Sequence, residues 1–390
     1  MTTAGRKERD PVHSSTEPSD DDIASLVATV QAVMERHFDP AEGVLRADAG
    51  PVEIGADPVW SVLTSQLDLG MLAVPASSGG YGMSLEGLSA VFGTFGRTLY
   101  PGPVTVRLAL VPYLLGRIPG VSQDEVRSAG SGLTGLIVDG AGAGIGGSVT
   151  SRTTDGGVRL TGSASALIDA RDCASFLVVA RSEDGVVLGR LGTDATGVTC
   201  TPRNSLDPTR ALTDVQLTDV EVEVLATGAD VERARDATVS VAAVLVAAQQ
   251  VAAAQRCLEI AVDYATIREQ FGRPIGSFQA IKHACADTYV AVEVMASFVP
   301  YVASQLDVEC PNSPLLAALK SKANRTGVAA AEQAIQVLGG IGFTWEHVAH
   351  LYLKRAVADA QLILGAPKLR ARMVDGVRTF DAIEHVVAYA

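Results

Sequence analysis

The sequence contains few cysteines, and their arrangement does not point to a structural bridge or a metal. Five cysteines are scattered over 390 residues, an odd number without any CxxC spacing. A disulfide framework or a zinc site is therefore not expected, and this usage fits a reducing cytoplasm. Three histidines also lack cysteine or carboxylate neighbours at metal-ligand spacing, so they are interpreted as helix-surface or interface residues and no metal site is predicted. The cysteines are Cys173, Cys200, Cys257, Cys285 and Cys310, and the histidines are His283, His347 and His350.

The chain also lacks a long, uninterrupted apolar run. No stretch reaches the roughly 18–20 apolar residues that are needed to cross a bilayer. The most apolar segment, 239–254, contains Gln249 and Gln250 and continues into charged residues, so it is predicted to be a buried helix. The first residues have no apolar core that could serve as a signal peptide, and their polar composition predicts a disordered tail over residues 1–21.

Basic residues are fewer than acidic residues. The chain has 31 Lys and Arg against 44 Asp and Glu, which gives a formal net charge of −13. An acidic surface repels polyanions, so neither nucleic acid nor an anionic membrane is an expected partner. A local basic or amide-lined pocket can still bind a phosphorylated ligand.

Three segments differ in their periodicity. A chain of this length should contain two or three domains at about 100–200 residues each. Residues 22–130 show helical periodicity, and Ser19 with Asp22, and Ser84, are predicted helix caps. Residues 131–228 carry short alternating apolar runs separated by turns, which predicts an antiparallel β domain, a barrel or a sandwich. Residues 229–390 are Ala-rich with long helical periods, which predicts a four-helix bundle.

The most specific motif, YATIREQFGRPIGSFQA, ends at Ala280. Arg268 is predicted near the end of a helix with Phe271 three residues later on the same side. Gly272 permits a left-handed turn and Pro274 prevents the helix from restarting. A guanidinium on such a corner suits a pyrophosphate, which it can bind with two parallel hydrogen bonds. The alternative is an ordinary Arg–Glu pair at a helix end.

A second motif, QVLGGIGF, starts at Gln336. A glutamine followed by Gly339 and Gly340 at a helix end offers a side-chain amide and bare backbone amides to a polar ligand. The alternative is a simple helix cap.

Together, in this order and spacing, the two motifs strongly resemble the acyl-CoA dehydrogenase family. The segment from Val59 to Leu85, with its VPASSGGYGMSL link, also resembles the early helices of that family. The α, β, α order of the segments matches, so the resemblance covers essentially the whole chain after the tail. It implies an α+β acyl-CoA dehydrogenase-like fold.

The resemblance also implies a cofactor, a reaction and partners. In this family the equivalent residues contact the diphosphate and adenine half of FAD across a dimer interface. The implied reaction is α,β-dehydrogenation of an acyl-CoA thioester, in which a carboxylate removes the α-proton and hydride passes to the flavin. The implied assembly is a homo- or hetero-tetramer with an acyl-CoA dehydrogenase-like sister chain, and an electron-transfer flavoprotein reoxidises its FAD. The implied FAD contacts are Arg268, Phe271, Gln279, Gln336, Val337, Gly339 and Gly340.

The general base of the family is missing from both of its usual positions. Counted from Arg355, the position of the usual Glu is Leu364. The alternative position, on the first long C-terminal helix, is Ala242. Neither side chain can take a proton. The nearest acids in sequence, Asp359 and Glu259, are interpreted as solvated or salt-bridged helix residues.

The β domain also departs from the family pattern. The loop and strand that hold the isoalloxazine ring correspond here to 137–147 and 164–169, and the usual Trp and Thr are absent. The run 142–147 fits G-x-G-x-x-G, but strand-like sequence follows it, so it is interpreted as a turn and not as a dinucleotide fingerprint.

Three interpretations remain open. The chain is a non-catalytic partner that lends FAD contacts to a sister chain, a self-sufficient dehydrogenase with an unidentified base, or a flavin-dependent hydroxylase of the same fold. The missing base and the altered ring site favour the first. Paired chains are known in this family, including in bacterial sterol side-chain breakdown, and the stretch GIGFTWEH resembles that branch.

Overall fold

The computed structural model describes residues 18–39, 57–131, 133–183, 185–306 and 313–363. Most of the predicted tail 1–21, and Leu364, lie outside these ranges. The first helix, α1 (Asp20–His37), begins inside the predicted tail. The predicted cap is present: Asp22 N–H donates to Ser19 Oγ at 3.3 Å and Ser19 N–H donates to Asp22 Oδ2 at 3.0 Å.

The N-terminal region is helical, as its periodicity predicts. Helix α3 (Pro58–Ser61) continues as the π-helical turn η2 (Val62–Gln66). Ser84 caps α4 (Leu85–Thr98), because its Oγ accepts from Gly87 N–H at 3.1 Å. The other elements are η3 (Leu69–Met71), η4 (Ala76–Ser78), η5 (Thr105–Leu110), α5 (Val111–Leu115) and α6 (Gln123–Ser131).

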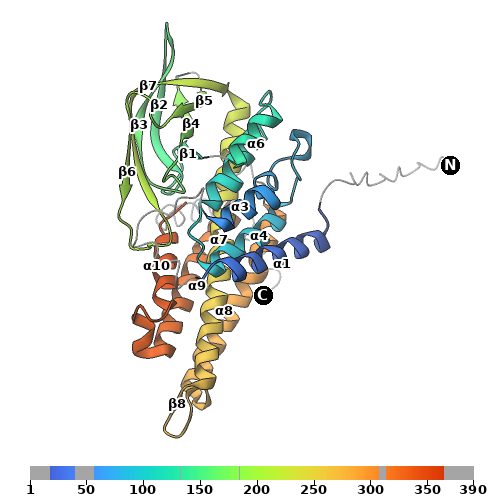
Figure 1. The fold of residues 1–390 in the computed structure, drawn as a ribbon, viewed down its shortest axis with the longest axis vertical. Coiled ribbons are helices and arrows are strands. Elements are labelled where there is room, and N and C mark those ends of the chain that lie inside the picture. Colours follow the sequence, from blue (N-terminus) through green and yellow to red (C-terminus); the bar gives the residue numbers. More distant parts are fainter. Residues whose placement is uncertain (1–17, 40–56, 132, 184, 307–312, 364–390) are drawn as a thin grey trace, which may run out of the picture.

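The middle region is a single seven-stranded sheet with the order β3-β2-β1-β4-β5-β7-β6, and a further β3–β7 pairing closes it on itself (Figure 1). The prediction of an antiparallel domain was wrong in part, because β1 pairs in parallel with both β2 and β4. Alternation of side chains has the same period in both kinds of sheet and so does not report strand direction. The strands are β1 (Thr134–Asp139), β2 (Gly146–Thr154), β3 (Gly157–Ile168), β4 (Ser175–Ser182), β5 (Gly185–Gly192), β6 (Val198–Arg203) and β7 (Leu212–Thr227).

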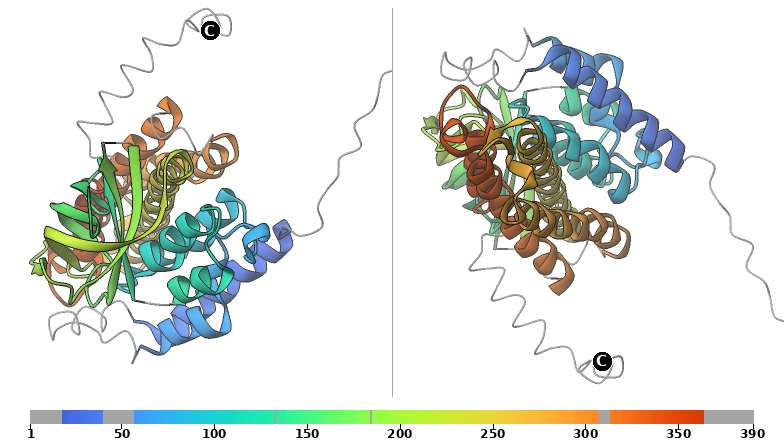
Figure 2. Two further views of the ribbon diagram at one scale, coloured as in Figure 1. Left: turned by 90° about the horizontal axis from the view of Figure 1, so that it is seen from above. Right: turned by 90° about the horizontal axis from the view of Figure 1, so that it is seen from below.

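The C-terminal region is built on α7 (Ala229–Ile267), which runs from the β domain to the opposite end of the molecule (Figure 1). By length and composition α7 could cross a membrane, but 94 % of its most apolar window is buried inside the protein, as expected of a core helix. Helices α4, α8 and α9 pack along it, and Figure 2 shows the sheet and the N-terminal helices on different sides of this bundle. The α, β, α layout is confirmed. The remaining elements are β8 (Glu269–Gln270), β9 (Arg273–Pro274), η6 (Ile275–Ser277), α8 (Gln279–Gln305), α9 (Pro314–Leu338), η7 (Gly339–Phe343) and α10 (Ala349–Asp359).

A buried ion pair joins the β domain to the helices. Arg355 of α10 and Asp207 of the loop after β6 are 4 % and 0 % exposed, and Nε lies 2.6 Å from Oδ2. Arg355 Nη2 also donates to the carbonyl and hydroxyl oxygens of Thr209. Because the guanidinium is held by three acceptors, the loop after β6 has one position against α10.

Helix α4 crosses α7 at a glycine. A Cβ atom added at Gly96 would lie 2.1 Å from the carbonyl oxygen of Gln249, a distance that no side chain can occupy. Gly93, one turn earlier, has only ordinary contacts at 3.7 Å with Ala248 and Ala252. The close approach of the two helices therefore depends on Gly96 and not on Gly93.

We expect Gly96→Ala to destabilise the protein by about 1–3 kcal/mol or more, because α4 must move away from α7. Gly93→Ala is the matched control, and it should be neutral or stabilise by up to about 1 kcal/mol through helix propensity. Urea unfolding followed by circular dichroism measures both. Equal stability of the two variants would contradict the crossing.

We expect Asp207→Asn to lower the free energy of unfolding by about 3–5 kcal/mol, because it leaves the Arg355 charge buried without its partner. The control is Asp230→Asn, which removes an exposed ion pair with Arg233 in the first turn of α7. An exposed pair contributes about 0–1 kcal/mol. If both variants lost the same small amount, the buried pair would not be what joins the domains.

Candidate functional site

The prediction that Arg268 lies near the end of a helix is confirmed, and the residue directly precedes a β-hairpin. Helix α7 ends at Ile267, and Arg268 is its extended cap residue, with its N–H donating to Tyr264 O at 2.9 Å. Phe271 and Gly272 both have positive φ, +55° and +75°, and form the tight turn between β8 and β9. The predicted i, i+3 placement of Arg268 and Phe271 was therefore wrong. Two consecutive left-handed residues make a two-residue hairpin turn, which helical periodicity does not anticipate.

The hairpin presents its side chains to solvent. Phe271 is 91 % exposed, and its ring packs edge-to-face on Phe278 with centroids 6.1 Å apart. Arg273 lies over the Phe278 ring at 4.2 Å. The Arg268 side chain is exposed and has no ion-pair partner among the residues that the structure describes, so an Arg–Glu pair at the helix end is not found there. Gln279 is the exposed first residue of α8.

The second motif ends α9 as predicted. Gln336 is exposed, and Gly339 follows the helix with φ +65°, a conformation that favours glycine. A Cβ at Gly339 or Gly340 would meet nothing within 4 Å, so the backbone there is open to a ligand. Val337 is only 5 % exposed and packs in the core, so it can offer a ligand its backbone but not its side chain. The hairpin and this loop both lie at the end of the helices remote from the β domain (Figure 1).

The opposite end holds the segments that correspond to the ring-binding loop and strand of the family. We call their contact zone the ring region: the turn 140–147, the strand end 164–169 and the segment 360–363 that precedes Leu364. The turn joins β1 directly to β2 without a helix, so the interpretation of the run as a turn is confirmed for 142–145, while Gly146 and Gly147 begin β2.

The ring region is closed. Ile168 N–H donates to Gly144 O at 2.8 Å, and Ile363 N–H donates to Ala143 O at 2.7 Å. The side chains of Ile168, Leu362 and Ile363 are at most 4 % exposed. We call the ring region closed in the sense that direct backbone hydrogen bonds join the turn to both other segments at these points.

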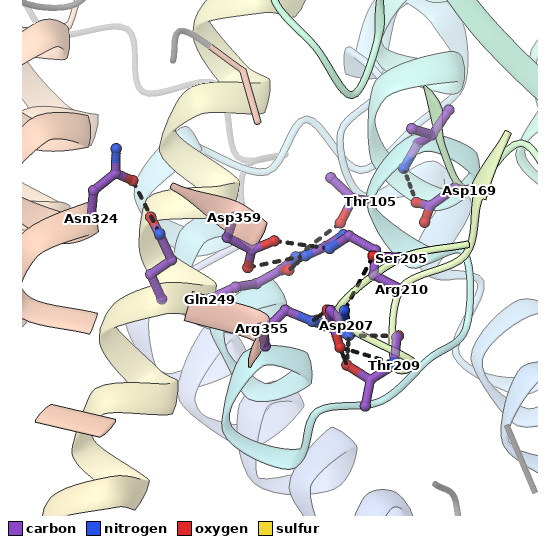
Figure 3. A network of polar contacts seen from close by, with 12 residues as sticks. Thr105, Asp169, Ser205, Asp207, Thr209, Arg210, Gln249, Asn324, Arg355 and Asp359 are labelled. Atoms are coloured by element: carbon purple, nitrogen blue, oxygen red, sulfur yellow. Dashed lines mark hydrogen bonds and ion pairs between the residues drawn. The ribbon is translucent and has the colours of Figure 1, made fainter. Parts of the chain in front are cut away.

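The candidate acids are held in ion pairs. Asp359 is 1 % exposed, and Arg210, 6 % exposed, binds it with Nε 2.9 Å from Oδ1 (Figure 3). Arg210 Nη2 also donates to Gln249 Oε1 at 3.0 Å. Glu259 accepts two hydrogen bonds from Arg97 at 2.6 and 2.7 Å and one from Arg256 at 3.0 Å. The interpretation of both acids as salt-bridged residues is confirmed.

The electrostatics of Glu259 do not suit a general base. Burial acts to raise the pKa of Glu259, but hydrogen bonds from Arg97 and Arg256 outweigh it and hold the pKa below its usual value. A base poised to take a proton near neutral pH needs the opposite shift. At the other expected position, Ala242 is 0 % exposed inside α7.

Lys320 was missed by sequence reasoning. Its side chain is 0 % exposed, and Nζ donates to Asn324 Oδ1 at 2.6 Å, to Asp359 O at 2.9 Å and to Gln250 Oε1 at 3.4 Å. Burial lowers the pKa of Lys320 to about 7, the Arg210 charge adds to this shift, and Asp359 opposes it. The sequence signal that could have identified Lys320 as buried is its helical spacing with Leu316, Leu319 and Ala323, which lie on the buried face of α9.

Arg107 and Asp169 were missed as well. Arg107, 0 % exposed, donates from Nε to Asp169 O at 3.1 Å, and the Asp169 carboxylate accepts from Val106 N–H at 2.8 Å. Burial raises the pKa of Asp169, against the opposing charges of Arg210 and Arg107. A lone arginine inside the apolar run 104–115 was the signal for this cluster.

The histidines take structural roles. His347 Nδ1 accepts from Ala349 N–H at 3.0 Å at the start of α10, and His350 packs edge-to-face on Trp345 with centroids 4.7 Å apart. Within the described ranges, no group of three or more His, Cys, Asp or Glu side chains is arranged to hold a metal ion.

Solved structures share this fold. The chain is similar to a structure of the ChsE4–ChsE5 complex from Mycobacterium tuberculosis, with a TM-score of 0.80, 24 % identity, and coverage of 94 % of this chain and 99 % of that one. A Tcur3481–Tcur3483 steroid ACAD variant gives a TM-score of 0.77 at 23 % identity over 92 % and 98 % of the two chains. Butyryl-CoA dehydrogenase from Megasphaera elsdenii gives 0.78 at 18 % identity over 93 % and 99 %.

Similar sequences carry the comparison further. The acyl-CoA dehydrogenase IpdE2 of Mycobacterium tuberculosis is 33 % identical over 87 % of this chain and 92 % of its own length. FadE34 of the same organism is 34 % identical over 85 % of this chain but 43 % of its own length, so this chain spans less than half of that protein. The family profile "Acyl-CoA dehydrogenase, C-terminal domain" matches residues 233–363. With this fold and these relatives, the chain belongs to the acyl-CoA dehydrogenase family of oxidoreductases.

Proposed function

We propose that this chain is the non-catalytic subunit of an FAD-dependent acyl-CoA dehydrogenase, and that it lends FAD contacts to a catalytic sister chain. The assembly dehydrogenates an acyl-CoA thioester between its α and β carbons, and FAD supplies the hydride acceptor. The proposed assembly is a tetramer of paired chains in the cytoplasm, with an electron-transfer flavoprotein as its electron acceptor.

The observation that carries this proposal is the contrast between the two ends of the helical bundle. At one end, the ring region is closed by the hydrogen bonds Ile168 N–H to Gly144 O and Ile363 N–H to Ala143 O. At the other end, Arg268, Phe271 and the Gly339–Gly340 backbone are exposed. A chain that closes its own ring region while exposing the groups for a diphosphate suits a ligand seated mainly in another subunit.

The exposed residues fit the diphosphate half of FAD. The Arg268 guanidinium is unpaired among the described residues and can bind two phosphate oxygens in parallel. Backbone amides beside a glycine at positive φ are suited to an anion, because no Cβ blocks the approach. Phe271, at 91 % exposure, offers a ring face for the adenine half. These residues hold and orient the cofactor, and the proton-removing carboxylate belongs to the sister chain.

The missing base supports the same assignment. Asp359 and Glu259 are fixed by arginines, and Ala242 has no titratable group. Two of the similar folds are complexes or pairs by name, ChsE4–ChsE5 and Tcur3481–Tcur3483, which supports a paired assembly for this chain also.

The first test is the visible absorbance of the protein, expressed alone and together with the acyl-CoA dehydrogenase-like chain encoded beside its gene. We expect no bound flavin for the chain alone and about half a flavin per polypeptide for the pair, because only one of the two ring sites is open. A yellow chain that binds stoichiometric FAD alone and is bleached by an acyl-CoA would overturn the proposal in favour of a self-sufficient dehydrogenase. Oxygen-dependent hydroxylation by the chain alone would favour the hydroxylase.

Within the purified pair, we expect Arg268→Met to weaken FAD retention at least tenfold, since a charged hydrogen bond to an anion contributes about 1.5–3 kcal/mol. Arg273→Met is the matched control, because Arg273 lies in the same hairpin but is stacked on Phe278. Its FAD dissociation constant should stay within about threefold of wild type. Equal losses in both variants would mean that the hairpin acts through net charge or folding and not through Arg268.

A further inference from the structure

The end of α10 is fixed by side chains from three other elements. Lys320 Nζ of α9 donates to the carbonyl of Asp359 at 2.9 Å, and Asn324 Nδ2 of the same helix donates to the carbonyl of Ala360 at 3.4 Å. These carbonyls belong to the last turn of a helix, where backbone acceptors have no partner within the helix. Gln250 of α7 donates from Nε2 to Asn324 Oδ1 at 3.0 Å and so holds Asn324 in place (Figure 3).

The carboxylate of the same residue is fixed separately. Arg210, from the loop after β6, binds Asp359 with Nε 2.9 Å from Oδ1. Asp359 is therefore held by its carbonyl from one side and by its side chain from the other.

The segment that follows immediately closes the ring region. Ile363, three residues after Ala360, donates its N–H to Ala143 O at 2.7 Å and is 0 % exposed. Its φ is +41°, which is unfavourable for a β-branched side chain and costs about 1–3 kcal/mol. A strained residue keeps its conformation only where its surroundings impose it. The fixed end of α10 is the nearest such constraint on the chain.

We propose that Lys320 and Asn324 are positioning residues, which hold the end of α10 so that segment 360–363 stays closed on the turn 140–147. This inference deepens the proposed function, because the same closure keeps a flavin ring out of this subunit. Both residues act through the Asp359 and Ala360 carbonyls.

The buried position of Lys320 makes the stability of this closure depend on pH. The charged groups that act on it are Asp359 of α10 and Arg210 of the loop, while α7 and α9 contribute the uncharged Gln250 and Asn324. Opening of the segment would hydrate the ammonium and return its pKa from about 7 toward its ordinary value of 10.5. The open state then binds more protons than the closed state between these two values, so closure becomes more favourable as pH rises above about 7.

The test is amide hydrogen exchange of the full chain, purified alone or with its sister chain, followed at Ile363 and Ile168 and corrected for intrinsic rates. For wild type we expect protection to be level below about pH 7 and to rise by up to tenfold per pH unit from about pH 7 to 9. Lys320→Met should remove this rise, and Asn324→Ala should lower protection at least tenfold at every pH. Lys322→Met, at an exposed position of the same helix, should behave as wild type.

A rise that persists in Lys320→Met, or wild-type protection in Asn324→Ala, would overturn the positioning role. A flat wild-type profile would overturn the pH dependence. Each variant tests the role separately, so the test holds even if one of them fails to fold. This outcome is also independent of the absorbance test for bound flavin. A chain that binds its own FAD but shows the expected exchange would refute the non-catalytic assignment and leave the positioning residues in place.

Discussion

The rest of the structure depends on two buried ion pairs that cross between one loop and one helix. Asp207 and Arg210 of the loop after β6 bind Arg355 and Asp359 of α10, so each element contributes one acid and one base. Because the partners lie four residues apart on α10 and three apart on the loop, the pairs fix both the distance between the β domain and the helices and the rotation of α10. The direction of the chain beyond Asp359 follows from that rotation, and this direction brings Ile363 onto Ala143.

That constraint separates the molecule into two ends with different chemistry. At the β-domain end, polar groups are buried and paired with one another, and backbone hydrogen bonds join the segments of the ring region. At the far end, the β8–β9 hairpin and the loop after α9 leave an arginine, an aromatic ring and glycine amides exposed. The core helix α7 connects the ends, and its close crossing with α4 at Gly96 keeps the bundle rigid between them. A subunit that supports a cofactor held elsewhere needs the second end and does not need an open first end.

Much of this was accessible from sequence. The α, β, α order, the caps at Ser19 and Ser84, and the glycine at the end of α9 follow from local rules that involve a few neighbouring residues. The hairpin after Arg268 was missed, because two successive positive φ values are rare enough that a helix end without a hairpin is the simpler reading. The parallel pairing of β1 was missed for a different reason: strand direction depends on which distant strands meet. The network around Lys320 was missed because, apart from Asn324 on the same helix, its hydrogen-bond partners lie 39 and 70 residues away, on α10 and on α7, and no local pattern records such contacts.

The closed ring region lies beside buried ion pairs. Buried ion pairs are weak sources of stability, because desolvation cancels much of their attraction, and apolar replacements of similar volume are often neutral or better. The four buried charged groups of the two ion pairs therefore indicate a requirement for position more than for stability. In the proposed non-catalytic subunit, no substrate must approach the position of the base, and the space can be given to groups that hold the chain still. Ile363 at φ +41° is consistent with this view, since a strained backbone persists only where its neighbours impose it. In the proposed assembly the closed end thus has a role of its own: it holds the β domain against the helices whose far end exposes Arg268.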